Sequence, residues 1–153
     1  MIRVIRLPTP RILLRKATAW RSKLLAARTE KERKRAEGKY KHPQVKEALV
    51  KMFRGKCAYC ESCIAHIDYG HIEHFRPKGG KSGQPKLTFE WSNLFLACGI
   101  CNGKQFKGDL FPGPADGGSF VNPCEEEPTD HFQFDFDENT GLANCTAPLA
   151  LDQ

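Results

Sequence analysis

The chain has 153 residues, of which 40% are hydrophobic, and it carries a net charge of +6. This length normally makes one domain, and no apolar run in the sequence is long enough to cross a bilayer. Arg3, Arg6 and Pro8 interrupt the opening residues before the apolar core of a signal peptide is reached. The composition therefore argues against a membrane protein or a membrane partner, and we expect a cytoplasmic protein.

Three helices are expected in the first third of the chain. The first, over residues 10–24, begins with a proline after a capping threonine and repeats apolar residues at helical spacing. The second begins at the capping-box pattern Thr29–Glu32 and runs toward Gly38. The third covers Pro43–Phe53, has one apolar face and leads directly into the first cysteine pair.

Short strands are expected in the middle of the chain, followed by one short helix. Ala65–Asp68 and His71–Phe75 are separated by a Tyr-Gly pair and fit a β-hairpin or bent ribbon. Leu87–Glu90 is the predicted second strand of the site, and Cys101–Lys107 the predicted short helix. The order β, β, α around one site follows from these assignments.

The last quarter of the chain predicts a second hairpin. Phe132, Phe134 and Phe136 alternate with polar residues, which is typical of a strand with one apolar face. Glu138–Gly141 fits a turn into a partner strand at Leu142–Thr146. The fold class expected for the whole chain is therefore α+β.

Charge is distributed unevenly along the sequence. Residues 1–56 hold 18 Lys/Arg and 4 Asp/Glu, residues 57–107 hold 6 and 4, and residues 108–153 hold none and 10. The first segment can attract a phosphate backbone without reading its sequence, and Arg33, Lys34 and Arg35 are its nucleic-acid-binding candidates. The alternative is a set of solvated helix faces. The acidic end can cover the basic arm or face a protein partner.

Four of the seven cysteines form two C-x-x-C pairs separated by 37 residues. The pairs are Cys57 with Cys60 and Cys98 with Cys101, and together they can supply four thiolates to one structural zinc. Cys63 forms an alternative pair with Cys60, so one ligand position stays open to a different register. Metal binding explains these cysteines better than disulfides, because no export signal is expected.

Acidic, histidine and asparagine residues lie between and beside the cysteine pairs, in the pattern expected of a metal-dependent nuclease. Hydrolysis of a phosphodiester needs a base for the attacking water and a cation at the phosphate. His74 is the predicted base, because an unperturbed histidine titrates near neutral pH. Glu73 and Asn102 are the predicted ligands of Mg²⁺ or Mn²⁺, which keep several waters and need few protein ligands. Because Glu73 and His74 are neighbours at a strand end, their side chains would point to different sides and place the cation and the base on opposite sides of the scissile phosphate.

The segments I-E-H-F-R-P-K, W-S-N-L-F-L-A-C-G-I-C-N and K-G-D-L-F-P resemble those of zinc-clamped HNH endonucleases, in particular the HNH nucleases of Septu-type and retron-associated antiphage systems. The resemblance implies a ββα-metal core over residues 57–112, between a basic helical arm (1–56) and an acidic extension with a β-hairpin (113–153). It also implies a separate ATPase subunit as partner. In the family pattern, Asn93 orients the loop that carries the histidine.

DNA is the expected nucleic-acid substrate, while the sequence leaves open double-stranded DNA, single-stranded DNA and RNA. Four basic residues flank the predicted site and can hold a phosphate backbone without base specificity: Arg76, Lys78, Lys104 and Lys107. Two alternatives remain from the sequence. A non-catalytic zinc-ribbon module would explain the cysteines and the basic arm, and a regulatory subunit descended from a nuclease would explain the motifs. The intact Glu73, His74, Asn93 and Asn102 set favours the enzyme.

Overall fold

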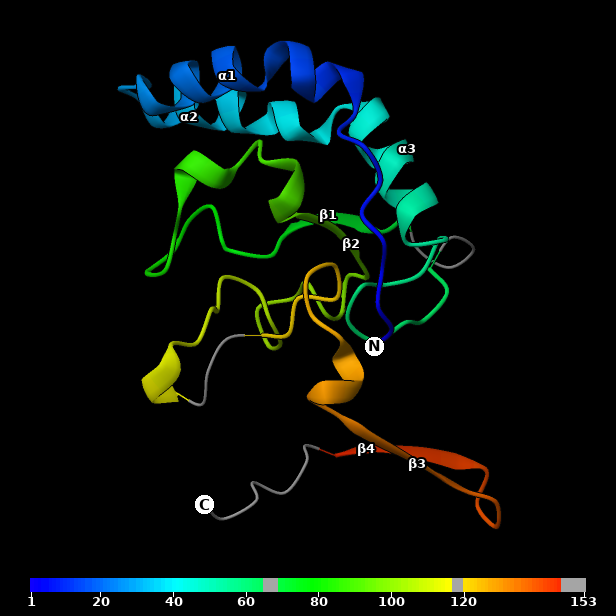
Figure 1. Ribbon diagram of the computed structural model, residues 1–153. Coiled ribbons are helices and arrows are strands. Elements are labelled where there is room, and N and C mark those ends of the chain that lie inside the picture. The colour runs from blue at the N-terminus through cyan, green and yellow to red at the C-terminus, as the bar shows by residue number, and fades with distance from the viewer. Residues whose placement is uncertain (65–68, 117–119, 147–153) are drawn as a thin grey trace.

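The computed structural model describes residues 1–64, 69–116 and 120–146. Three helices form one layer above a small antiparallel sheet, and a separate hairpin lies at the opposite end of the molecule (Figure 1). The helices are α1 (Arg11–Leu25), α2 (Glu30–Glu37) and α3 (Pro43–Met52). The fold is α+β, as expected from the sequence. Within the described residues, no helix is long and apolar enough to cross a membrane.

The helix boundaries follow local sequence rules. Pro10 is itself the N-cap of α1 and no side chain caps that helix, so the predicted threonine cap is wrong. At the start of α2, the Thr29 hydroxyl accepts from the backbone N–H of Glu32 (3.2 Å), which completes a capping box. At α3, Nδ1 of His42 accepts from the backbone N–H of Gln44 (3.2 Å), and Pro43 occupies the first helical position. All three predicted helices are therefore confirmed, with a short 3₁₀ turn at Gly38–Lys41 between the last two.

The central sheet has two strands, β1 (His71–His74) and β2 (Leu94–Ala97). They pair antiparallel, with Glu73 opposite Phe95 and His74 opposite Leu94. Every residue of β2 is buried, which explains why its sequence is continuously apolar and does not alternate. The buried strand β2 therefore holds β1 in place through their backbone pairing.

The second strand predicted in the centre of the chain is wrong. Leu87–Glu90 is not a strand, because it lies between 3₁₀ turns at Pro85–Leu87 and Trp91–Asn93, and β2 takes its place as the partner of β1. Proline at position 85 cannot donate to a strand ladder. Residues 65–68, the other half of the first predicted hairpin, lie outside the described residues.

The predicted helix at Cys101–Lys107 is also wrong, because this segment is a series of turns. Its backbone bonds do not form a helical ladder: Gly103 N–H donates to Ile100 (2.9 Å), and Lys107 N–H donates back to Cys101 (3.2 Å). Gly108 ends the segment with a positive φ of 43°, a conformation that glycine adopts at little cost. The third element of a ββα core is therefore not a regular helix here.

One hydrophobic core joins the helices to the central sheet. Leu13 and Leu24 of α1 and Leu49 of α3 belong to the same buried cluster as Phe95 of β2. The chain before α1 also crosses this core, where the Trp91 indole N–H donates to the carbonyl of residue 7 (2.7 Å). The basic arm therefore packs against the centre, and the division into three segments stays a prediction.

The hairpin predicted near the end is confirmed as β3 (Gln133–Asp137) and β4 (Leu142–Thr146), which pair antiparallel. Its predicted apolar face does not pack onto the core, because Phe134 and Phe136 remain 47% and 66% exposed. The hairpin therefore projects from the body of the molecule (Figure 1).

Candidate metal clamp and catalytic pocket

Four cysteines from two distant segments meet at one end of the central sheet. The sulfur atoms of Cys57, Cys60, Cys98 and Cys101 all lie within 4.8 Å of one another, and those of Cys60 and Cys98 are 3.9 Å apart. A tetrahedral zinc with bonds of about 2.3 Å to sulfur requires sulfur atoms about 3.8 Å apart. The geometry therefore fits a structural metal such as zinc.

Backbone groups around the sulfur atoms support this assignment. The backbone N–H of Cys98 donates to the sulfur of Cys57, and that of Cys101 donates to the sulfur of Cys98, both at 3.3 Å. Such bonds stabilise the thiolates that a metal needs. Cys63 is exposed, lies outside the cluster and pairs with Lys56 through an isolated backbone β-bridge. The structure therefore favours the pair Cys57 and Cys60 over the pair Cys60 and Cys63.

The cysteine cluster is joined directly to the sheet. Cys98 follows the last residue of β2, and the backbone N–H of Ala58 donates to the carbonyl of Leu96 within β2 (2.8 Å). Because β2 carries β1 as its partner, the clamp fixes the strand on which Glu73 and His74 lie.

Removal of one thiolate should therefore unfold the centre. A structural zinc supplies roughly 10–16 kcal/mol, comparable with the whole stability of a domain. We predict that Cys98→Ser loses stoichiometric zinc and cooperative unfolding, whereas Cys63→Ser and Cys145→Ser keep both. The check is zinc content by mass spectrometry together with thermal melting. A full zinc complement and normal melting in Cys98→Ser would contradict the clamp.

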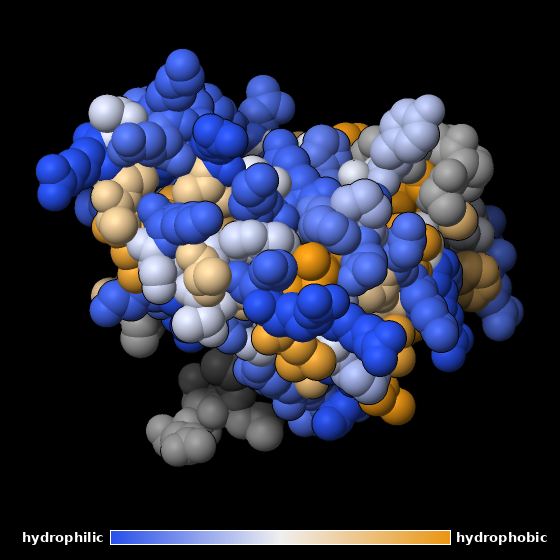
Figure 2. All heavy atoms as spheres, turned by 90° about the horizontal axis from the view of Figure 1, so that it is seen from above, coloured by the Kyte–Doolittle hydropathy of each residue, from blue (hydrophilic) through white to orange (hydrophobic). Residues whose placement is uncertain are grey.

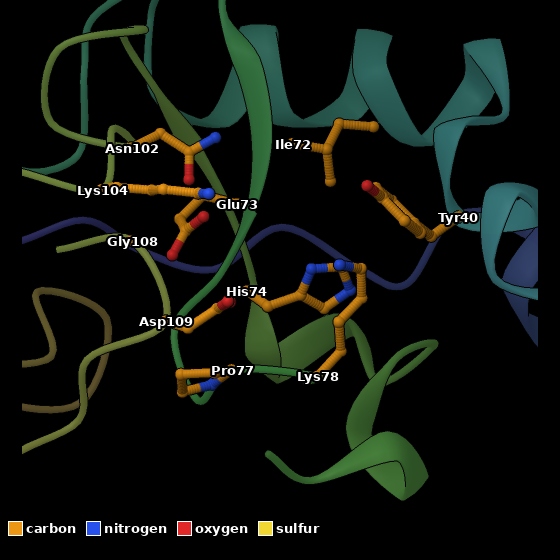
Figure 3. Close-up of a pocket in the computed structure, with 10 residues that line it drawn as sticks. All are labelled: Tyr40, Ile72, Glu73, His74, Pro77, Lys78, Asn102, Lys104, Gly108 and Asp109. Atoms are coloured by element: carbon orange, nitrogen blue, oxygen red, sulfur yellow. The ribbon is translucent and has the colours of Figure 1, made fainter. Parts of the chain in front are cut away.

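The predicted catalytic residues surround one small polar pocket of about 160 Å³ (Figure 3). Its lining comes from the 3₁₀ turn after α2, from β1 and the loop that follows it, and from the turns after the second cysteine pair: Tyr40, Ile72, Glu73, His74, Pro77, Lys78, Asn102, Lys104, Gly108 and Asp109. In Figure 3, Glu73, Asn102 and Lys104 lie at one end, and His74 lies with Tyr40 and Lys78 at the other. The predicted base and both predicted cation ligands thus share one cavity.

His74 is held as a neutral ring with a defined tautomer. Its Nε2 lies 3.1 Å from the carbonyl oxygen of Thr88, and because a carbonyl only accepts, Nε2 carries the hydrogen and Nδ1 is the acceptor. The pKa of His74 is lowered to about 4, mainly by burial and also by the ammonium groups of Lys78 and Lys107, while the bond to Thr88 opposes this shift. The ring of Tyr40 contacts the imidazole edge-on, with centroids 4.6 Å apart.

Glu73 is buried and paired with a buried lysine. Its Oε1 lies 2.5 Å from Nζ of Lys107, and the two side chains are 7% and 4% exposed. Burial raises the pKa of Glu73, while Lys107 opposes that rise by stabilising the carboxylate. Lys107 was expected to contact a phosphate from the surface. Its ammonium group is instead buried against Glu73.

Asn93 lies behind the pocket and braces the backbone that follows His74. Its side-chain oxygen accepts from the backbone N–H of Arg76 (2.8 Å), and its amide donates to the carbonyls of Arg76 (3.0 Å) and Leu87 (3.3 Å). The arrangement is compatible with the predicted orienting role, which stays a prediction. The guanidinium of Arg76 stacks 4.5 Å from the ring centroid of Phe111, while Lys78 and Lys104 line the pocket as expected.

Sequence reasoning assigned no role to Tyr40, Thr88 or Asp109. Asp109 lies within the quoted K-G-D-L-F-P segment and adds a second carboxylate to the pocket. Tyr40 comes from the basic arm, and Thr88 acts through its carbonyl. No sequence spacing reveals either contact, because both depend on tertiary packing.

The depressed pKa of His74 couples folding to pH. The unfolded histidine titrates near 6.5 and the folded one near 4, so the unfolded state binds the proton more readily between these values. Stability therefore falls as pH is lowered from about 6.5 toward 4, by up to about 3 kcal/mol. Urea unfolding in excess zinc should show a flatter pH dependence in His74→Gln, while His71→Gln, with an exposed ring, should keep the original slope. Equal slopes in all three proteins would contradict the assignment.

Comparison with known proteins connects this site to named relatives. A Septu protein PtuB of Bacillus mycoides (strain KBAB4) is 36% identical over 126 residues, which are 67% of this chain and 41% of that protein. A Septu protein PtuB of Bacillus thuringiensis is 35% identical over 92 residues, covering 60% of this chain and 33% of the relative. A candidate HNH endonuclease of retron Vc95, from Vibrio cholerae serotype O1 biovar El Tor, is 34% identical over 82 residues, covering 53% and 38%.

No family model and no solved structure matches the chain. The chain spans less than half the length of these relatives, since the matched share of each is at most 41%. The matches nevertheless agree with the resemblance carried by the central motifs. The chain is therefore a relative of the Septu PtuB proteins and of an HNH-type protein of a retron, as those motifs predict.

Proposed function

We propose that this protein is a metal-dependent HNH endonuclease that hydrolyses phosphodiester bonds in DNA. The observation that carries the proposal is a neutral, buried His74 with an accepting Nδ1, in the same small pocket as Glu73 and Asn102. A base, a carboxylate and an amide oxygen are the groups that cation-assisted hydrolysis needs. The similarity to a candidate HNH endonuclease supports the same conclusion.

His74 would act as the general base. Because Nε2 is bonded to the carbonyl of Thr88, Nδ1 is the atom that accepts the proton of the attacking water. The edge contact with Tyr40 keeps the imidazole from turning. Burial keeps the ring unprotonated at neutral pH, so essentially every molecule has an active base, although the low pKa makes it a weaker one.

Glu73 and Asn102 would hold the divalent cation, Mg²⁺ or Mn²⁺, through their side-chain oxygen atoms. Both line the pocket, and hard oxygen donors suit these ions, which take their remaining ligands from water and phosphate. When bound, the cation neutralises charge on the phosphate and on the departing oxygen. The chain's own contribution is to fix Glu73 on β1 and to hold Asn102 immediately after the cysteine clamp.

The substrate backbone would approach over basic residues that the structure sorts into two groups. Arg33 pairs with Glu37 (3.2 Å) and Lys34 pairs with Glu30 (3.6 Å), each within α2. Arg35 instead lines a groove between α1 and α2, and Lys39 lines the same groove. Among the described residues, Arg35 forms no ion pair. The sequence candidates in α2 are thus not equivalent.

The groove between α1 and α2 has a volume of about 720 Å³. It is lined by alanine side chains and Trp20, by one acidic residue, Glu32, and by four basic residues, Lys23, Arg28, Arg35 and Lys39. Lys39 is followed by Tyr40, which lines the catalytic pocket. Figure 2 shows the face of the molecule above these helices as largely hydrophilic, with small apolar patches. We infer that a phosphate backbone follows this surface from the groove to the pocket.

We also propose a role in antiphage defence in the cytoplasm beside an ATPase subunit, as expected from the sequence; the similarity to Septu proteins and to a retron protein supports the part in defence. The exposed Phe134 and Phe136 of the acidic hairpin offer a surface to such a subunit. A non-catalytic zinc-ribbon module and a regulatory subunit are the competing functions. Neither requires a buried, neutral histidine beside a buried carboxylate, so the state of the pocket favours the enzyme.

Loss of His74 should separate cleavage from folding and binding. A positioned base contributes 10²–10⁴-fold, so His74→Ala should lose about that factor in DNA cleavage in Mg²⁺ or Mn²⁺ while keeping zinc and DNA affinity. Asn102→Ala should instead require more divalent cation for its remaining activity. The assay uses purified protein supplemented with the ATPase subunit. Cleavage by His74→Ala at the original rate would show that His74 is not the base.

Loss of charge in the α1–α2 groove should weaken DNA binding more than loss of charge on the outer face of α2. Each phosphate contact contributes close to one unit to the dependence of log affinity on log salt. We predict that Arg35→Gln with Lys39→Gln lowers this slope by about two. The charge-matched variant, Arg33→Gln with Lys34→Gln, should change it less. Fluorescence anisotropy across a salt series makes the comparison, and equal slopes in the two variants would exclude the groove as the path.

A further inference from the structure

Lys107 is a buried cation whose ammonium group donates two hydrogen bonds to backbone carbonyls and forms an ion pair with Glu73. Its Nζ lies 2.5 Å from Oε1 of Glu73, 3.0 Å from the carbonyl oxygen of His74 and 3.3 Å from that of Gly108. A lysine ammonium has three donors, and the residue is only 5% exposed. Lys107 is thus engaged inside the protein and cannot reach a phosphate from the surface.

These contacts join the two segments that form the pocket. Glu73 and His74 are the last residues of β1, whereas Gly108 begins the turn that carries Asp109 into the pocket. A single ammonium group therefore fixes the spacing between the end of the strand and this turn. It also places a positive charge directly beside the carboxylate of Glu73.

The charges around the pocket bear directly on cation binding. The carboxylates of Glu73 and Asp109 face three ammonium groups, those of Lys78, Lys104 and Lys107. The pocket therefore carries no formal excess of negative charge, and a divalent cation gains little by entering it alone. A phosphate diester would bring both the missing negative charge and additional oxygen ligands.

We propose that Lys107 is a positioning residue that neutralises Glu73, so that the divalent cation binds together with the phosphate of the substrate and not before it. This inference rests on the proposed nuclease function, because it concerns the same cation site. It gives the protein a simple form of control: the site is complete only when nucleic acid is present.

Mn²⁺ binding, measured by the electron paramagnetic resonance signal of the unbound ion, tests this coupling. The protein carries His74→Ala, so that an added DNA duplex stays intact. With Lys107 present, the duplex should tighten Mn²⁺ binding at least tenfold. In Lys107→Met, Mn²⁺ should bind at least tenfold more tightly without DNA, and the duplex should add less than threefold. Lys107→Arg, which keeps the charge, should retain the original coupling.

Lys104→Met is the matched control, because it removes an exposed charge from the same pocket while the ion pair between Glu73 and Lys107 is kept. Its effect on Mn²⁺ binding without DNA should be smaller than that of Lys107→Met. An equal effect, or no tightening in Lys107→Met, overturns the inference. Cleavage of the duplex by His74→Ala, or no Mn²⁺ binding under any condition, would instead show that the proposed function has failed.

Thermal melting provides a second test if Lys107→Met folds poorly. Removing one member of a buried ion pair leaves the other charge unpaired, whereas removing both does not. The double variant Glu73→Gln with Lys107→Met should therefore melt at a higher temperature than either single variant. A double variant that melts no higher than the less stable single variant would show that the two side chains are not coupled, which overturns the inference.

Discussion

The attachment of the cysteine clamp to β2 is the constraint on which the rest of the structure depends. A two-stranded sheet is at best marginally stable alone, and β1 has only four residues. The clamp holds β2 through Cys98 and through the bond from Ala58 to Leu96, while α1 and α3 cover it with apolar side chains. A structural metal held by these four cysteines would add stability to so short a sheet.

The pocket beside this sheet contains two buried ionisable groups, and burial shifts their pKa values in opposite directions. His74 is kept neutral by burial, with help from the positive charges of Lys78 and Lys107, although its bond to the Thr88 carbonyl opposes this shift in pKa. Burial raises the pKa of Glu73, and its ion pair with Lys107 opposes that rise. Burying an imidazole or a carboxylate costs free energy of solvation, even when the group is hydrogen-bonded or paired. Their presence here therefore favours a chemical role over a structural one. The Tyr40 contact also links the pocket to the basic arm.

The sequence predicted what depends on neighbouring residues and missed what depends on packing. The three helices and the second hairpin follow local capping and alternation rules, and the cysteine spacing identified the clamp. The strand at Leu87–Glu90 was wrong because the fully buried β2 shows no alternation. The helix at Cys101–Lys107 was wrong because the segment forms turns that end at Gly108 with a positive φ. The burial of Lys107 was unpredictable, since an acidic partner on another segment decides it.

Anomalous diffraction from crystals grown with zinc, Mn²⁺ and a DNA duplex tests the central claim most directly, because it locates each metal separately. Our account predicts zinc bound by Cys57, Cys60, Cys98 and Cys101, and Mn²⁺ bound by Glu73 and Asn102 together with a phosphate oxygen. Nδ1 of His74 should face that phosphate. Manganese bound elsewhere, or DNA bound with no phosphate in the pocket, would contradict the account.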